Sequence, residues 1–236
     1  MSDQERTRGS GEDRGIPDLE RVRMSYDAVA DAYVERVHGE LVHKPLDRAL
    51  LAAFGEQIRA LDGPGASACD MGCGPGHVGA VLADQGLSVT GIDLSPEMVA
   101  RARDLHPEMA FEVGTMTSLD VPSGRFNGIV AFYSIIHLVT DAEVDAALAE
   151  FHRVLAAGGL LLIAVHLAEG GDATVRTEEM LGVSVDLDFR FFDLDGLAAA
   201  ITAAGFDVTA RLVRAPYDGV EVQTTRGYLL ARRMGE

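Results

Sequence analysis

The chain has 236 residues, 47% of them hydrophobic, and its 20 basic against 37 acidic residues give a formal net charge of −17. The hydrophobic content is ordinary for a globular protein and sufficient for one substantial core. So negative a chain is a poor match for nucleic acid or for an anionic membrane, because both are bound through clustered Lys and Arg. We therefore expect a small-molecule partner, no nucleic acid and no membrane, and the sequence predicts no particular oligomeric state.

The expected compartment follows from the cysteines and from the first residues. Cys69 and Cys73 are too few for a disulfide scaffold, and with no third cysteine they lack the partners of a zinc site. We interpret them as small reduced side chains. Residues 1–15 are polar, unlike a secretory signal, and the longest apolar stretch, residues 158–165, is too short to cross a bilayer. These features predict a cytoplasmic protein.

The first quarter of the chain is predicted to be a tail followed by helices. Residues 1–18 are charged and rich in Gly and Ser, which predicts a disordered tail. Apolar residues then recur at helical spacing, so residues 19–61 are predicted to form an N-terminal helical cap in which Pro45 opens the second helix. The spacing of Tyr26 and Tyr33 places both rings on one face of the first helix.

Residues 62–236 are predicted to form one domain in which short apolar strands alternate with amphipathic helices. The first five strands are predicted at 67–71, 88–93, 109–113, 128–133 and 160–165. The helices between them are predicted at 76–85, 95–104 and 140–158. Ser95 and Thr140 are the expected N-caps, and Gly158 is expected to end the third helix.

The rhythm changes in the last part of the chain. Residues 167–192 are mixed and acidic, which predicts an insertion on the acceptor side rather than another strand–helix unit. A helix capped by Asp193 and stopped by Gly205 follows, and strands at 206–213 and 222–230 are close enough to pair as a hairpin. The whole pattern predicts an α/β fold: a doubly wound, mostly parallel, Rossmann-like sheet of seven strands with an antiparallel C-terminal hairpin and an N-terminal helical cap.

The strongest local signal is a glycine-rich turn between a strand and a helix. Asp70 ends the strand, and Gly72, Gly74 and Gly76 follow it. Such glycines let the backbone approach a ligand closely, and the free N–H groups of the next helix face that ligand. The stretch also satisfies the dinucleotide fingerprint, with Asp93 placed to bind ribose hydroxyls, so an NAD(P)-dependent oxidoreductase is one interpretation.

Four segments in order resemble class I S-adenosylmethionine-dependent methyltransferases of the small-molecule type: Ala68–Gly76, Val89–Met98, Phe126–Val130 and Glu150–Gly159. The resemblance implies S-adenosylmethionine as cofactor, with its methionine end held by Asp70 and the three glycines and its ribose held by Asp93. Leu94 and Met98 are expected to contribute to the cofactor site as well. The family commonly has an acid after the third strand that accepts from the adenine amino group, and this chain departs from it with Thr115 and Met116. We expect the Thr115 hydroxyl or a backbone carbonyl to accept instead, and Met116 to pack on the adenine face. The stretch from Tyr26 to Tyr33 resembles the lid of that family, which closes over the methionine end.

The methyl acceptor is expected beyond the carboxyl ends of the fourth and fifth strands. His137 is the predicted general base and His166 the second choice, because a neutral imidazole accepts protons near neutral pH. A packed histidine bonded to backbone is the alternative interpretation for either residue. The further acceptor contacts are predicted from Tyr133, Ser134, His38 and Phe191.

Together these features predict an S-adenosylmethionine-dependent methyltransferase that acts on a small molecule, with a hydroxyl oxygen as acceptor. No metal is expected, since Ser134, His137 and His166 are poor ligands for hard cations. Two alternatives remain open. One is the NAD(P)-dependent oxidoreductase, and the other is a protein of the methyltransferase fold that binds S-adenosylmethionine without transferring methyl, as a sensor or a cyclase.

Overall fold

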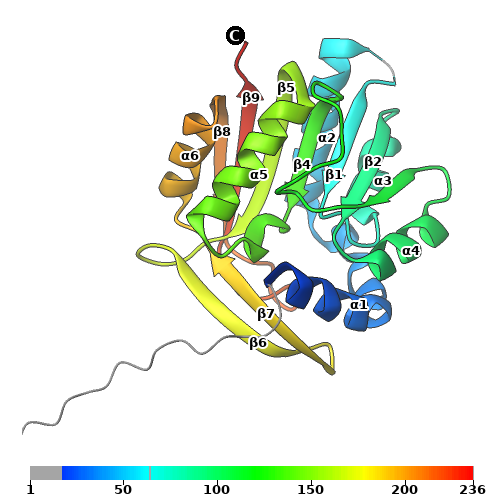
Figure 1. Ribbon diagram of the computed structural model, residues 1–236, viewed down its shortest axis with the longest axis vertical. Coiled ribbons are helices and arrows are strands. Elements are labelled where there is room, and N and C mark those ends of the chain that lie inside the picture. The colour runs from blue at the N-terminus through cyan, green and yellow to red at the C-terminus, as the bar shows by residue number, and fades with distance from the viewer. Residues whose placement is uncertain (1–17, 64, 236) are drawn as a thin grey trace, which may run out of the picture.

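A seven-stranded sheet with helices on both faces forms the centre of the computed structural model, which describes residues 18–63 and 65–235 (Figure 1). The strand order is β3-β2-β1-β4-β5-β9-β8; β1 to β5 run parallel, and β9 pairs antiparallel with both β5 and β8. The strands are β1 Ser67–Met71, β2 Ser88–Asp93, β3 Ala110–Val113, β4 Phe126–Phe132, β5 Leu155–His166, β8 Phe206–Arg214 and β9 Arg226–Arg233. The predicted fold class, with its antiparallel C-terminal hairpin, is confirmed.

Ser95, Thr140 and Asp193 each cap a helix by accepting a hydrogen bond from an N–H group of its first turn. Ser95 Oγ accepts from the N–H of Met98 at 3.1 Å, and Thr140 and Glu143 form both halves of a capping box. The helices are α1 Asp18–Val37, η1 Glu40–His43, α2 Pro45–Asp62, α3 His77–Ala83, α4 Pro96–Leu105, η2 Ile135–His137, α5 Asp141–Val154 and α6 Leu194–Ala203. The apolar stripes of α2 and α3 cover one face of the sheet, and those of α5 and α6 cover the other.

The predicted helical cap over residues 19–61 divides into two parts. α1 lies across the carboxyl ends of the strands (Figure 1) and is called the lid below. α2 instead buries Leu51 and Ile58 against the sheet, so it belongs to the layered core and not to a cap. The predicted tail, residues 1–18, lies outside the described residues except for Asp18, which begins α1.

The segment predicted as an insertion, residues 167–192, contains a separate two-stranded sheet on the far side of the lid (Figure 1). Its strands are β6 Ala173–Met180 and β7 Val183–Phe191. Leu181 and Gly182 turn the chain with φ of 55° and 78°. Val185 and Leu187 of β7 are buried against α1, so the lid is held between the main sheet and this hairpin.

The helix before β5 ends earlier than predicted. α5 ends at Val154, and Gly158, with φ of 74°, lies inside β5. The pairing of β5 with β4 shifts register between Phe126 and Gly128, opposite this glycine. Gly158 therefore allows an irregularity within a strand rather than a helix stop, because glycine adopts the left-handed region without strain.

Candidate functional site

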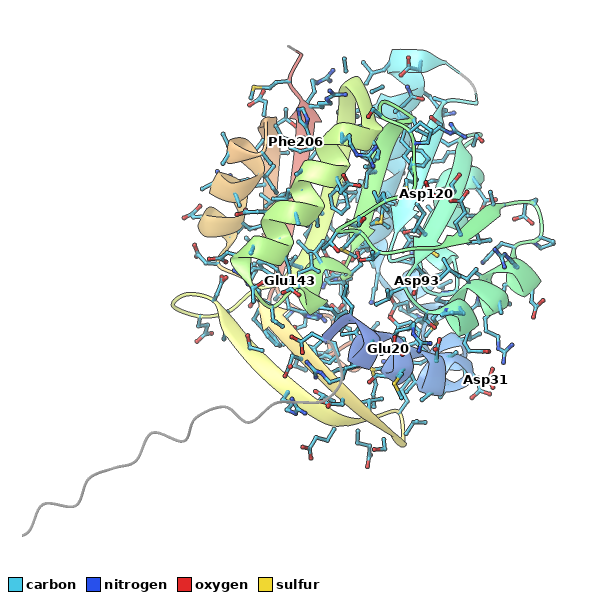
Figure 2. All side chains as sticks on the ribbon, in the orientation of Figure 1. Glu20, Asp31, Asp93, Asp120, Glu143 and Phe206 are labelled. Carbon is cyan, nitrogen blue, oxygen red and sulfur yellow. The ribbon has the colours of Figure 1, made fainter. Side chains whose placement is uncertain are left out.

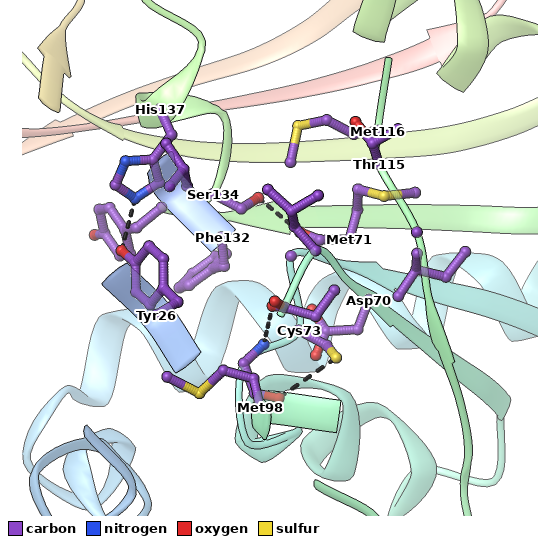
Figure 3. A pocket seen from close by; sticks show the side chains of 18 of the residues that line it. Tyr26, Asp70, Met71, Cys73, Met98, Thr115, Met116, Phe132, Ser134 and His137 are labelled. Atoms are coloured by element: carbon purple, nitrogen blue, oxygen red, sulfur yellow. Dashed lines mark hydrogen bonds between the residues drawn. The ribbon is translucent and has the colours of Figure 1, made fainter. Parts of the chain in front are cut away.

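A cavity lies at the carboxyl ends of β1, β2 and β4, closed on one side by the lid (Figure 3). It gathers side chains from segments that are far apart in the sequence. The predicted residues that line it are Tyr26, Tyr33, Asp70, Gly72, Gly74, Asp93, Leu94, Met98, Thr115, Met116, Tyr133, Ser134 and His137. The fold therefore brings the predicted cofactor motifs and the first-choice base to one place.

The glycine-rich turn forms one wall of the cavity, and its geometry requires glycine. Gly72, Gly74 and Gly76 have φ of 69°, 50° and 82°, a region that other residues enter at a cost. A Cβ at Gly72 would lie 2.3 Å from the Cβ of Ser134. The Ser134 hydroxyl donates to the Met71 carbonyl at 2.6 Å (Figure 3), so the end of β4 closes directly on the turn. Gly76 is the N-cap position of α3 and lies outside the lining.

Two carboxylates stand at the ends of β1 and β2. Asp70 Oδ2 accepts from the N–H of Gly79 in α3 at 2.8 Å, and burial raises the pKa of Asp70 to about 6. Asp93 accepts from the N–H of Gly74 at 2.8 Å and from that of Ser95 at 2.9 Å, and burial raises its pKa as well. Asp93 therefore ties the glycine-rich turn to β2 while it faces the cavity.

His137 is held in a defined orientation in the cavity wall. Its Nδ1 lies 3.3 Å from the carbonyl oxygen of Asp188, which can only accept, so Nδ1 carries the hydrogen. Its Nε2 lies 2.6 Å from the Tyr26 hydroxyl, which donates to it (Figure 3). Phe189 packs on the ring with 4.9 Å between centroids, and burial lowers the pKa of His137 to about 4. The imidazole is therefore neutral near pH 7, with its lone pair at Nε2.

The lid presents aromatic rings to the cavity and exposes charged side chains such as Asp31 to the solvent. Tyr26 and Tyr33 pack edge to face with 5.8 Å between ring centroids. Asp31, on the same helix, has 78% of its side chain exposed, whereas Asp93 lies inside the molecule (Figure 2). This division is that of an amphipathic helix whose inner face meets a ligand site.

Three of the predicted acceptor-side residues lie outside the cavity lining, which corrects their expected roles. His166 ends β5, but Arg226, its partner in the β5–β9 register, places a guanidinium nitrogen 2.6 Å from its Nδ1, and burial lowers the pKa of His166 to about 3. Phe191 packs on the His166 ring at 5.5 Å. His38 is exposed, with its ring 5.9 Å from that of His106.

The structure adds lining residues that the sequence reasoning missed, among them His77 and Phe132. His77 is the first residue of α3, and its Nε2 lies 3.6 Å from a carboxylate oxygen of Glu40. Among the described residues, none offers a hydrogen-bond partner to its buried Nδ1. A signal for His77 was present, because the residue that opens a helix after a glycine-rich turn faces whatever ligand the turn holds.

Tyr133 has a backbone φ of 54°, which is uncommon for a residue with a side chain. Its ring lines the cavity, and its hydroxyl lies 2.8 Å from that of Tyr228. Tyr228 donates to the fully buried Asp47 at 2.8 Å, and Arg214 binds both of these residues at 2.9 and 2.8 Å. This buried network anchors Tyr133 in a strained conformation at the edge of the site.

The chain's own groups fit S-adenosylmethionine. The turn leaves no room for a Cβ at Gly72, two carboxylates face the cavity, and His77 keeps an unpartnered nitrogen beside it. These features suit a ligand with a ribose diol and an amino-acid end. Within residues 18–63 and 65–235, no three His, Cys, Asp or Glu side chains are grouped as metal ligands. Over the same ranges, the helices are too short or too polar to span a bilayer.

Comparison with known proteins agrees with the geometry. Residues 68–159 match the family model of a methyltransferase domain. The chain is 32% identical over 117 residues to a demethylmenaquinone methyltransferase from Beutenbergia cavernae, an alignment that covers 50% of this chain and 45% of that relative. The alignments cover less than half the length of the first three curated relatives, at 47%, 45% and 32%.

Solved structures share the whole architecture. The [4+2]-cyclase SpnF aligns with a TM-score of 0.70 at 20% identity, over 93% of this chain and 97% of that one. The 1,6-didemethyltoxoflavin-N1-methyltransferase of Burkholderia thailandensis, solved with 1,6-didemethyltoxoflavin and S-adenosylhomocysteine, aligns with a TM-score of 0.62 at 23% identity, over 90% and 91%. Residues 68–159 thus match a methyltransferase domain, and the chain shares the fold of these solved structures.

Proposed function

We propose that this chain transfers a methyl group from S-adenosylmethionine to a hydroxyl oxygen of a small molecule, in the cytoplasm and without a metal ion. The observation that carries the proposal is the orientation of His137. Its Nδ1 is bound by the Asp188 carbonyl, and its Nε2 lone pair points to the lid tyrosine at the cavity wall. A hydroxyl loses its proton on methylation, and a neutral imidazole at the cavity wall is a suitable acceptor for that proton.

Each part of the site has a role in this reaction. S-adenosylmethionine supplies, when bound, an electrophilic methyl group on a sulfonium. Asp70 and the glycine-rich turn would hold the amino-acid end, Asp93 would hold the ribose, and Thr115 and Met116, which line the same cavity, would contact the adenine. The lid keeps water from the cavity and limits the orientations of the acceptor, which is the main requirement of an in-line transfer.

The charges of the lining favour a neutral acceptor. Among the described residues that line the cavity there is neither Lys nor Arg, whereas Asp18 and Glu143 are both present. A carboxylate or phosphate on the acceptor would have no cationic partner there and would be costly to desolvate. Tyr133 and Ser134 are the proposed neutral contacts, and residues 167–192 complete the acceptor side through their contact with the lid.

The test has two stages. Calorimetry with S-adenosylhomocysteine should show binding to the wild type and at least about tenfold weaker binding to Asp93→Ala, which loses the proposed ribose contact. The exposed Asp120 provides the matched control, Asp120→Ala. The chain is then incubated with S-adenosylmethionine and a panel of neutral alcohols, phenols and amines, and S-adenosylhomocysteine production is measured.

Production of S-adenosylhomocysteine with a hydroxyl acceptor, reduced about a hundredfold in His137→Ala, is the expected result. No binding of S-adenosylhomocysteine at high micromolar concentration would contradict the cofactor assignment. Binding without any product across the panel would favour the alternative of a cyclase-type or sensor protein. Transfer to amines alone would contradict the hydroxyl acceptor.

A further inference from the structure

Arg21 is a charged residue of the lid that is buried, with 8% of its surface exposed. Its guanidinium reaches from α1 to β7 of the hairpin. One nitrogen donates to the carbonyl of Asp186 at 3.1 Å and to its carboxylate at 2.9 Å, and another donates to the carboxylate of Asp188 at 2.7 Å. The lid is therefore held to the hairpin by charge-assisted hydrogen bonds, of which the one to Asp188, whose side chain is 16% exposed, is the better shielded from water.

Asp188 makes a second contact through its backbone carbonyl. Its side chain binds Arg21, and its carbonyl oxygen accepts from Nδ1 of His137 at 3.3 Å. The other nitrogen of His137 accepts from Tyr26, which lies on the same helix as Arg21. The contacts thus form a closed ring that runs from Arg21 through Asp188 and His137 to Tyr26 and back along α1.

The groups around His137 make this ring sensitive to charge. On the lid these are Tyr26, Arg21 and Asp18; on β7 they are Asp186 and Asp188; and Arg176 of β6 pairs with Asp186 at 2.6 Å and approaches Asp188 at 3.8 Å. Glu143 lines the same cavity, and His166 stands at the end of β5. The charge of Asp188 favours the protonated imidazole and Arg21 offsets that charge.

We propose that Arg21 is a positioning residue of the acceptor site. By holding Asp188 from the lid, it fixes His137 as the tautomer with hydrogen on Nδ1 and directs Nε2 into the cavity. Closing of the lid and alignment of the base are then one event. This inference rests on the proposed function of His137, because positioning matters for catalysis only if His137 is the base.

The inference is tested on the full chain saturated with S-adenosylhomocysteine, so that no acceptor is needed. Proton and nitrogen NMR of labelled histidine reports the tautomer and the pKa of His137, whose signal among the 7 histidines is assigned with His137→Ala. Arg21→Met removes the charge at similar length, and Asp188→Asn removes the other half of the pair. Arg23→Met is the matched control, because Arg23 pairs with Glu20 and Asp27 within the same helix.

We expect the wild type and Arg23→Met to show His137 mainly as the tautomer with hydrogen on Nδ1. In Arg21→Met, the Asp188 carboxylate loses its nearer positive charge, which raises the pKa of His137 by about one unit, and the tautomer preference falls. In Asp188→Asn, the pKa moves in the opposite direction. Opposite shifts distinguish a charge effect from simple loosening of the lid, which would move both variants the same way.

Two results separate the inference from the function on which it rests. An unchanged tautomer and pKa in Arg21→Met, with binding of S-adenosylhomocysteine within about twofold of wild type, would overturn the positioning role whatever the rate of His137→Ala. A wild-type methylation rate in His137→Ala would overturn the proposed base, whatever the spectra of Arg21→Met show.

Discussion

The hydroxyl of Tyr26 lies 2.6 Å from Nε2 of His137, so the lid itself occupies the nitrogen to which we propose the acceptor hydroxyl gives its proton. An acceptor can reach that nitrogen only by displacing or joining the tyrosine. The contact also closes the lid, since Tyr26 belongs to α1 and His137 to the segment after β4. Under the proposed function, the same pair controls access to the cofactor and availability of the base.

This contact predicts that substitutions of Tyr26 and His137 have non-additive effects on the free energy of ligand binding. Tyr26→Phe and His137→Ala should each weaken binding of S-adenosylhomocysteine about fivefold, because each removes one hydrogen bond worth about 1 kcal/mol. The double variant should bind no more weakly than either single variant, since the same contact is lost. Calorimetry on the four proteins measures this, and fully additive effects would contradict a direct contact.

Burial of Asp70 is expected to lower the stability of the fold in a pH-dependent way, although its carboxylate favours ligand binding. Its pKa is about 6 in the folded chain against an ordinary 3.8, so the folded state holds the extra proton between these values. Stability therefore falls as pH rises from about 4 to about 6, and the loss persists above that range. Asp70→Asn removes the free-energy cost of the buried negative charge. We therefore expect this variant to be more stable than wild type at pH 7 by about 1–3 kcal/mol.

Urea unfolding at pH 7 and at pH 4.5 measures this effect, with the advantage of Asp70→Asn shrinking at the lower pH. The same variant should bind S-adenosylhomocysteine at least about tenfold more weakly, because the ammonium group of the ligand loses its carboxylate partner. Asp120→Asn, at an exposed position, should leave both quantities unchanged. An Asp70→Asn protein less stable than wild type at pH 7 would refute the proposed cost of the buried charge.

A comparison of Gly72 with Gly124 separates the cost of a steric clash from the cost of a left-handed backbone. Gly72 and Gly124 have nearly the same φ, 69° and 68°, but a Cβ at Gly72 meets Ser134 whereas a Cβ at Gly124 meets nothing within 4 Å. Gly124→Ala should cost only the left-handed strain, about 1–2 kcal/mol. Gly72→Ala should cost about 1–3 kcal/mol more and abolish cofactor binding, because the turn must move away from β4. Equal losses in thermal unfolding would argue against the close approach.

Arg214 predicts a large loss of stability from a buried ion pair. It binds Asp47, which is completely buried, so Arg214→Met leaves an uncompensated charge in the core. Removal of one partner of such a pair costs about 3–5 kcal/mol. Arg211→Met, on the same strand, removes an exposed pair with Asp195 and should change stability by less than about 0.5 kcal/mol. Similar unfolding midpoints for the two variants would contradict the buried network.

Much of the cofactor half of the site could be predicted from the sequence. Asp70 and the glycines are neighbours in the chain, and Asp93 follows at the end of the next strand, so local turn chemistry and the parallel order of β1 and β2 are enough to bring them together. The caps at Ser95 and Thr140 were predictable for the same reason, because an N-cap bonds within its own first turn.

The acceptor half could not be predicted, because its side chains are sorted by partners that are distant in the sequence. His137 and His166 both follow central strands and look equivalent in the sequence. Arg226 of the antiparallel β9 forms a hydrogen bond with the His166 ring, whereas Asp188 of the hairpin and Tyr26 of the lid bind His137 at the cavity. The two histidines therefore differ in their tertiary contacts and not in their local sequence pattern.

The sequence by itself determined the order of strands and helices, the glycine-rich turn and the two carboxylates of the cofactor site, since periodicity and short-range spacing dictate them. Only the tertiary structure decided that α2 belongs to the core, that the acidic segment after β5 is a hairpin, and that Arg21 and Asp188 reach His137. Those outcomes depend on which surfaces bury one another, and contacts such as those of Asp188 with Arg21, 167 positions away, and with His137, 51 positions away, leave no periodic trace in the chain.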